Sequence, residues 1–161
     1  MITLDEFVDR LCRLGADGAS RRFPRNARDR EILMQSVVME LDSERSYAEK
    51  EINVRLEAWS RDVAPSIEID HVTLRRLLVD YQRLERTADG ASYRVGFPAR
   101  TVAFELEVYD LDLRATVAAY RDQLARSRER RKAAAPAATR DRAARSRNRP
   151  RAATLPAPPP P

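Results

Sequence analysis

The side chains in this chain that are best suited to chemistry lie in one stretch and are mostly basic: His71, Thr73, Arg75, Arg76, Arg86 and Arg94. An arginine guanidinium is a planar fork of N–H donors that can bridge O6 and N7 of guanine or clamp a phosphate. Arginine and histidine near a base-reading helix can also contact the flanking phosphates. These residue types therefore indicate contact with double-stranded DNA.

Catalysis has little support in the sequence. The chain has one histidine, one cysteine and four glycines, and it lacks HExxH, CxxC and phosphate-binding loop spacings. The single thiol, Cys12, sits beside the apolar stripe of a predicted helix, which is typical of a core residue. The sequence predicts a protein that is not an enzyme and that needs no metal or cofactor.

The DNA-contacting residues would be positioned by a helix and a hairpin. Asp70 is a good N-cap for a helix over residues 70–81, in which Leu74, Leu77, Leu78 and Tyr81 would face a core while the arginines face away. The segments 84–86 and 92–95 bracket an Asp89-Gly90 turn, which predicts a two-stranded hairpin.

Three further helices are predicted before residue 70. Thr3 and Glu6 form a capping-box pattern for a helix over 3–14, and an apolar face predicts a second helix over 27–41. Ser46 and Glu49 form another capping-box pattern, for a helix that ends near Trp59. The segments 15–26 and 60–69 are interpreted as a linker and a loop.

The fold class that this order of elements predicts is mainly α. Three helices followed by a two-stranded β wing make a winged helix-turn-helix, whose third helix, 70–81, would lie in the major groove. An extra N-terminal helix, a C-terminal helix and a disordered tail would surround it. The expected divisions are 1–20 for the first helix and its linker, 21–98 for the winged-helix domain, 99–132 for the helical extension and 133–161 for the tail.

The segment after Pro98 fits two patterns. Residues 101–108 alternate as a strand would, but a longer stripe that continues to Leu124 has nearly helical spacing, which favours a helix from about 99 to 132. Part of that stripe has heptad-like spacing and could pack on the domain's own core or form a homodimer seam. Its residues are Leu113, Val117, Tyr120 and Leu124.

Charge is distributed unevenly along the chain. Residues 1–120 carry 18 Lys/Arg against 22 Asp/Glu, a net −4, whereas residues 121–161 carry 12 against 3, a net +9. The Arg/Ala/Pro-rich tail could bind phosphates without sequence preference or could merely aid solubility. No apolar run approaches the length of a membrane span, and no signal peptide is recognisable, so we expect a cytoplasmic protein without a membrane partner.

Four stretches carry a family resemblance: FPRNARDREIL, RSYAEKEIN, TLRRLLVDYQRLER and DGASYRV. Over about residues 23–95 they resemble the bacterial domain of unknown function family 2087. The resemblance implies a winged-helix-like module of the kind found in transcriptional regulators, with a somewhat longer loop here before the third helix. It also carries over a set of polar positions: Tyr47, Glu49, Glu51, Asn53, Arg75, Arg76 and Asp80.

Two functions follow as expectations. The first is a DNA-binding transcriptional regulator that uses helix 70–81, the hairpin and the basic tail. The second is a protein–protein interaction module on the same scaffold. The nearly neutral charge of the module supports this second function, since residues 21–100 hold 15 Lys/Arg and 14 Asp/Glu. In that case Arg75 and Arg76 would pair with acids such as Glu49 and join helices together.

Overall fold

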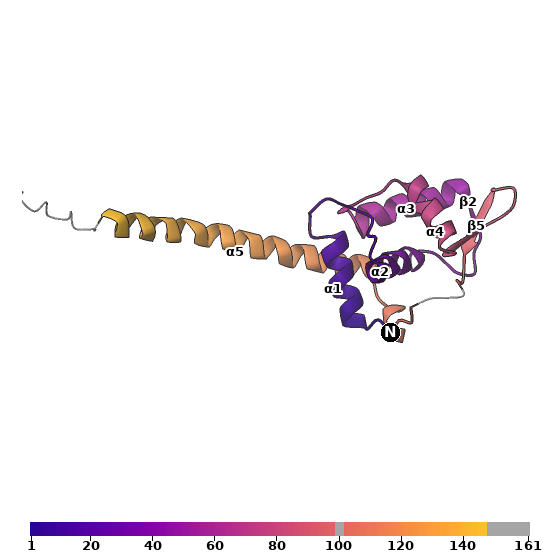
Figure 1. Cartoon of the computed structure of the whole chain (residues 1–161), viewed down its shortest axis with the longest axis horizontal. Coiled ribbons are helices and arrows are strands. Elements are labelled where there is room, and N and C mark those ends of the chain that lie inside the picture. The colour runs from indigo at the N-terminus through magenta and orange to yellow at the C-terminus, as the bar shows by residue number, and fades with distance from the viewer. Residues whose placement is uncertain (99–101, 148–161) are drawn as a thin grey trace, which may run out of the picture. The chain divides into compact units, whose positions relative to one another are not determined.

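The computed structural model describes residues 1–98 and 102–147, with side chains described as far as residue 134. The chain divides into unit 1, Met1–Gln123, and unit 2, Leu124–Pro161. Helices dominate, and the strands are short (Figure 1). In chain order the elements are α1 Leu4–Gly15, β1 Arg21–Arg22, α2 Ala27–Val38, β2 Tyr47–Ala48, α3 Glu49–Asp62, β3 Ile67–Glu68, α4 His71–Asp80, β4 Leu84–Arg86, β5 Ser92–Val95, the 3-10 helix η1 Leu106–Val108, and α5 Leu113–Arg147.

Three helix starts follow from local capping. The Thr3 hydroxyl accepts from the Glu6 backbone N–H at 3.2 Å, which confirms the predicted start of α1. Asn26 caps α2. Asp70 caps α4 by accepting from the Thr73 N–H at 2.9 Å, as predicted. In each case a side-chain oxygen satisfies an N–H that has no partner inside the helix.

The predicted start of α3 is wrong by a few residues. The N-cap is Ala48, and the Glu51 carboxylate accepts from the Ala48 N–H at 3.1 Å, so the Ser46–Glu49 capping box does not form. The cause is non-local, because Tyr47 and Ala48 pair with β5 as strand β2. The helix also continues to Asp62, beyond the predicted end at Trp59.

A three-stranded antiparallel sheet has the strand order β2-β5-β4. The hairpin strands β4 and β5 have the predicted bounds, with Leu84 opposite Val95, while β2 was not predicted as a strand. At the turn, Gly90 donates its N–H to the Thr87 carbonyl at 2.8 Å. Gly90 has φ +75, whereas Asp89 does not take a positive φ, so only the glycine supplies the conformation expected of the pair.

A second small sheet joins two segments that were interpreted as a linker and a loop. Strand β1 runs parallel to β3, with Arg21 opposite Ile67 and Arg22 opposite Glu68. The Arg21 N–H also donates to the Ser66 carbonyl at 2.8 Å. Two-residue strands leave no periodic pattern, so this pairing could not be predicted from the sequence.

The predicted helix over 99–132 is wrong in its first part. Residues 99–101 lie outside the described part of the chain, residues 102–112 hold a bridge and η1, and α5 begins only at Leu113. Phe104 pairs with Ile2 in a parallel bridge: the Ile2 N–H donates to the Ala103 carbonyl at 2.8 Å, and the Ile2 carbonyl accepts from Glu105 N–H at 3.0 Å. This long-range pairing overrides the apparent helical spacing.

The core of unit 1 lies between the helices and the sheet. Trp59 is fully buried, and its Nε1–H donates to the Ser36 hydroxyl at 3.0 Å, which in turn donates to the Leu33 carbonyl. Leu74 and Leu78 of α4 are buried as predicted. Tyr81 was expected in the core but is 39% exposed, and the Arg30 guanidinium lies 4.6 Å from its ring centroid.

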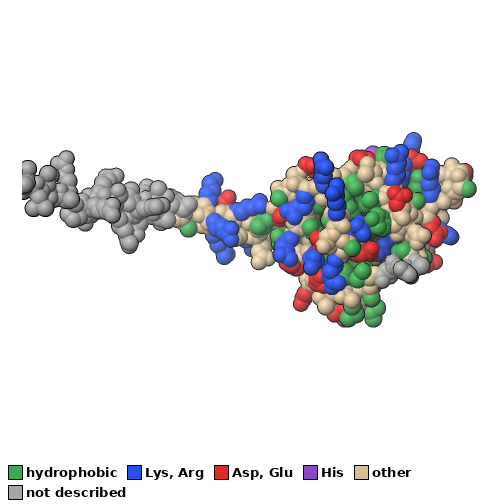
Figure 2. All heavy atoms as spheres, viewed as in Figure 1, with side chains coloured by type: hydrophobic (Ala, Val, Ile, Leu, Met, Phe, Trp, Pro, Cys, Tyr) green, Lys and Arg blue, Asp and Glu red, His purple; other side chains and the backbone are tan. Residues whose placement is uncertain are grey.

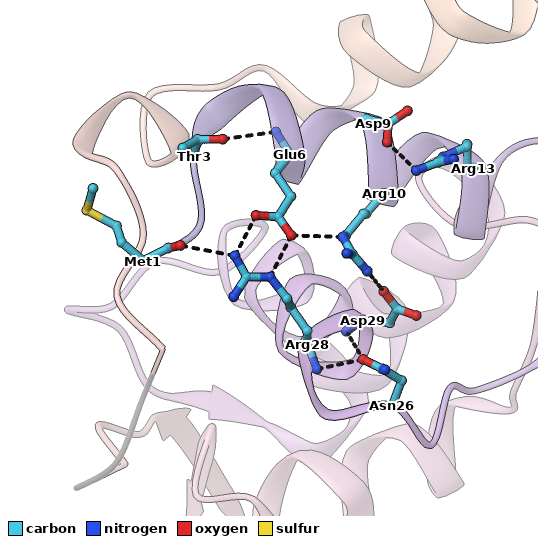
Figure 3. A network of polar contacts seen from close by, with 9 residues as sticks. All are labelled: Met1, Thr3, Glu6, Asp9, Arg10, Arg13, Asn26, Arg28 and Asp29. Carbon is cyan, nitrogen blue, oxygen red and sulfur yellow. Dashed lines mark hydrogen bonds and ion pairs between the residues drawn. The ribbon is translucent and has the colours of Figure 1, made fainter.

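Helix α1 is tied to α2 by a polar network (Figure 3). The Glu6 carboxylate binds Arg28 through both oxygens and Arg10 at 2.9 Å, and Arg10 continues to Asp29 at 2.6 Å. Arg28 also donates to the Met1 carbonyl at 3.1 Å. The arginines, Arg28 foremost, lower the pKa of Glu6 to about 2.

Helix α5 belongs to both units. Leu113 and Val117, two members of the proposed dimer seam, are 4% and 0% exposed in the core of unit 1, and Tyr120 packs against that core. The intramolecular alternative therefore holds for these residues. The structure describes the helix as far as Arg147, residues 148–161 lie outside the described part, and the disorder of 133–161 stays a prediction. None of the described helices is long and apolar enough to cross a membrane.

Candidate nucleic-acid interface

The exposed surface of α4 begins with a self-contained cap. The Thr73 hydroxyl donates to the second carboxylate oxygen of Asp70 at 2.6 Å while the backbone N–H of Thr73 binds the first. These bonds, led by that of the hydroxyl, hold the pKa of Asp70 below its usual value. Thr73 is exposed, and because its hydroxyl proton is bound to Asp70, the hydroxyl can offer another group only an acceptor.

Arg75 does not face solvent as predicted. Its side chain is 11% exposed, and its Nη1 lies 3.2 Å from Glu49 Oε1. The same nitrogen donates to the Asn53 carboxamide oxygen, and the guanidinium carbon lies 5.3 Å from the Tyr93 ring centroid. Arg75 therefore fastens α4 to α3 and to β5, which is the joining role that the sequence had left as an alternative.

Arg76 is the arginine that α4 leaves available. It is exposed, and within the described part of the chain it makes no hydrogen bond or ion pair. Thr73 and Arg76 are three residues apart, so they lie on the same face of the helix. This pair is what remains of the predicted groove-reading set on α4.

His71 is only partly available at the start of α4. Its Nδ1 lies 3.0 Å from the Glu57 carboxylate of α3, and its side chain is 32% exposed. An acidic neighbour at this distance competes with any phosphate for the imidazole. Glu57 therefore occupies Nδ1 of His71 and leaves Nε2 for the predicted phosphate contact.

The two predicted hairpin arginines differ in their surroundings. Arg94 pairs with Glu85, its partner in the strand register, at 2.5 Å, and its side chain is 66% exposed. Arg86 lies against the backbone of Gly90, with its guanidinium carbon 5.9 Å from the Tyr93 ring centroid. Exposed pairs such as Glu85–Arg94 are weak in water, so both guanidinium groups can exchange partners at little cost.

The polar positions carried over by the resemblance have mainly structural roles. Glu49 and Asn53 of α3 converge on Arg75, and Tyr47 is 2% exposed with its hydroxyl accepting from the Asp42 N–H at 2.7 Å. Glu51 binds Arg45 and the N-cap backbone of α3. These motif residues thus join β2, α3, α4 and β5.

Sequence reasoning missed two residues at this junction. Tyr93 is 2% exposed and receives both Arg75 and Arg86 on its ring, so it links α4 to the hairpin. The sequence contained a sign of this role, because Tyr93 is the tyrosine of DGASY and the alternation of a strand turns it inward. Arg83 is 5% exposed and pairs with Glu31 of α2, and nothing in its local pattern distinguished it from a surface arginine.

The wider electrostatics of unit 1 are mixed. Lys/Arg and Asp/Glu side chains alternate over the face shown in Figure 2, so no single-sign field covers it. Over the described residues, no group of three or more His, Cys, Asp or Glu side chains is arranged to hold a metal ion. Cys12 is 1% exposed, and burial raises the pKa of its thiol to about 11, so it stays protonated near neutral pH.

Comparison with known proteins adds a family and nothing more specific. No curated protein and no solved structure matches the chain. A family model described as "Uncharacterized protein conserved in bacteria (DUF2087)" matches residues 20–95. The matched segment holds α2, α3, α4 and all five strands of the part of the chain that the structure describes. Residues 20–95 therefore match the domain of unknown function family 2087, the family that the motifs of the sequence resemble.

Proposed function

We propose that this chain is a non-enzymatic, DNA-binding transcriptional regulator. One observation carries the proposal: the element order α2–β2–α3–β3–α4–β4–β5, in which β3 pairs with β1 in the other sheet, combined with the strand order β2-β5-β4. Three helices, a first strand that pairs with the last, and a terminal hairpin are expected of the winged variant of helix-turn-helix, and this arrangement supports the proposal. In helix-turn-helix proteins the second helix of the motif, here α4, enters the major groove.

This proposal uses fewer DNA-contacting residues than the sequence predicted. Thr73 and Arg76 would face the groove, because they are the exposed polar residues near the start of α4. Arg86 and Arg94 of the hairpin would contact flanking phosphates after Arg94 leaves Glu85. Arg75 would act indirectly by fixing the angle of α4 against α3 and Tyr93.

A second candidate function rests on the charges around α4. His71 and Arg75 are engaged by Glu57 and Glu49, and Asp70 and Asp80 flank the helix. Carboxylates at these positions repel phosphates. The same surface would then serve as a docking platform for another protein, with α4 and the hairpin as the contact elements.

The test begins with selection of duplexes from a random-sequence library by the full chain, at a salt concentration high enough to suppress non-specific binding. Fluorescence anisotropy then measures the affinity for a selected and a scrambled duplex. We expect Arg76→Ala to weaken binding to the selected duplex about tenfold or more and to relax its specificity. The matched control is Arg55→Ala, because Arg55 is an exposed arginine of the neighbouring helix α3.

The outcomes separate the two functions. Loss of preference in the Arg76 variant, but not in the Arg55 variant, supports DNA reading by α4. If no sequence is enriched, or if both variants behave alike, the reading role fails and the docking platform leads. Light scattering on the same samples tests dimerisation, for which Leu113 and Val117 are not available because they are buried.

A further inference from the structure

A cavity of about 480 Å³ lies in unit 1, away from the exposed face of α4. Its wall is formed by the end of α2, the end of β5 and the segment from Val102 to Tyr109. Most of the wall is apolar, with Val38, Met39 and Phe104 among the lining residues. The volume falls within the range of cavities that hold small organic ligands.

The Gln35 carboxamide reaches this cavity without a protein partner. Gln35 is 6% exposed, and none of the described residues forms a hydrogen bond with its side chain. Its amide atoms are open to the cavity, so water or a ligand there satisfies them. Because the Gln35 amide lies at the cavity wall, a molecule inside the cavity can supply the missing hydrogen bonds.

The charge of the cavity wall selects the kind of molecule. Arg83 lines the cavity and is 5% exposed, and its guanidinium donates through Nη2 to Glu31. A guanidinium has five N–H donors, so four are left after this bond. Among the described residues, no Asp or Glu lines the cavity. The wall therefore offers a ligand the unused N–H donors of Arg83, whose charge is shared with Glu31, and no carboxylate among the described lining residues.

We propose that this cavity binds a small carboxylic acid with an apolar body. The carboxylate accepts hydrogen bonds from Arg83 and from the Gln35 amide, and the apolar body packs on Val38, Met39 and Phe104. A guanidinium with unused N–H donors is suited to a carboxylate, whereas an ammonium group finds no acidic partner among the described lining residues. Ligand binding at this cavity does not depend on DNA binding. The ligand-binding experiment can therefore fail while the DNA-binding proposal stands, and the reverse.

The experiment uses the full chain and benzoate as the probe, with benzyl alcohol and benzylamine as neutral and cationic comparisons. Isothermal titration calorimetry and ligand-observed NMR measure binding. We expect saturable binding of benzoate, weaker binding of benzyl alcohol and none of benzylamine. Gln35→Leu should weaken benzoate binding about tenfold. Gln123→Leu should leave it unchanged, because Gln123 is exposed on α5 and away from the cavity lining.

A second variant guards against misfolding of the first. Val38→Phe fills part of the cavity from a position that is only partly buried, and it should abolish benzoate binding while the circular dichroism spectrum stays that of the parent chain. The proposal is overturned if benzoate shows no saturable binding, if benzylamine binds as well as benzoate, or if folded Gln35→Leu or Val38→Phe protein binds with the affinity of the parent chain.

Discussion

At the residue scale, two adjacent arginines have opposite roles. Arg75 has contacts with Glu49, Asn53 and the Tyr93 ring and is 11% exposed, whereas Arg76 is exposed. We expect Arg75→Ala to lower the free energy of unfolding by about 2 kcal/mol, because it removes packing and leaves partly buried polar groups without a partner. Arg76→Ala should change it by less than about 0.5 kcal/mol. Urea denaturation of both variants measures the difference, and equal effects would contradict the assigned roles.

A second prediction at this scale concerns the end of α4. Gln82 has φ +56, a backbone conformation that strains residues other than glycine. It lies just after the helix, where the N–H of Arg83 donates to the Leu78 carbonyl at 2.7 Å. Gln82→Gly should therefore raise the free energy of unfolding by about 1 kcal/mol. The control, Arg55→Gly in the middle of α3, should lower it by about 1 kcal/mol. Chemical denaturation decides, and a destabilised Gln82→Gly chain would refute the strain argument.

Gly96 shows why the hairpin and α4 cannot move apart freely. A Cβ at this position would lie 2.4 Å from the Gln82 carbonyl oxygen, and the Gly96 N–H donates to the Arg83 carbonyl at 2.9 Å. Gly96→Ala should cost about 1–3 kcal/mol of stability because backbone must shift. At Gly90 the nearest atoms belong to the flexible Arg86 side chain, so Gly90→Ala should cost only the strain of its positive φ, about 1 kcal/mol. Thermal melts compare the two, and a smaller loss in Gly96→Ala would contradict the clash.

At the scale of elements, the attachment of α1 to α2 should depend on pH. Arg28, together with Arg10, lowers the pKa of Glu6 to about 2 from an ordinary value of 4.5. A carboxylate with a lowered pKa in the folded state stabilises the fold above about pH 4.5, and this contribution disappears as the pH falls toward 2. Glu6→Gln should therefore lower the melting temperature at pH 7 and leave it nearly unchanged at pH 2.

The control for this prediction is Glu107→Gln, because Glu107 is an exposed carboxylate of η1 outside the network of Figure 3. Melting curves by circular dichroism at pH 7, 4 and 2 give the comparison. A gap between the parent chain and Glu6→Gln that stays constant over this range would show that the ion pairs with Arg28 and Arg10 do not link stability to pH.

The elements that could be predicted from sequence are those fixed by neighbours along the chain. The Asp70 cap, the Leu74 and Leu78 spacing and the hairpin around Gly90 depend on contacts within a few residues, and each is present. The β1–β3 pair and the Ile2–Phe104 bridge join residues far apart in sequence. Local periodicity carries no information about such pairs.

The candidate site was harder to predict for the same reason. The sequence pattern placed the arginines of α4 on an exposed face, because a helical wheel divides α4 into a leucine face and a polar face. Glu49 could be named as a possible partner of Arg75, but the pattern cannot show that Asn53 and Tyr93 also approach Arg75 from other positions in the chain. Nor can it show that Gln35 and Arg83 meet at one cavity, since α2 and the start of β4 are brought together only by folding.

At the scale of the whole molecule, the two units have opposite charge. Unit 1, residues 1–123, carries 19 Lys/Arg against 23 Asp/Glu, a net −4, and residues 124–161 carry 11 against 2, a net +9. Figure 2 shows basic side chains along the described part of α5. The residues that make up the core of unit 1 end at Val117. Folding and non-specific attraction to phosphates should therefore be separable along the chain.

A chain that ends at Gln123 tests this separation. We expect its melting temperature to stay within a few degrees of the full chain, because every core residue is retained. Its affinity for a scrambled duplex at low salt should fall by about tenfold or more, and the slope of log affinity against log salt should become shallower, since fewer phosphates are neutralised.

The control keeps the full length and replaces Arg126, Arg128, Arg130 and Arg131 with Gln. It should lose affinity in the same direction if charge, rather than chain length, is the cause. A truncated chain that melts far below the full chain would mean that α5 beyond Gln123 is needed for the fold, and an unchanged salt slope would mean that unit 1 itself holds the phosphates.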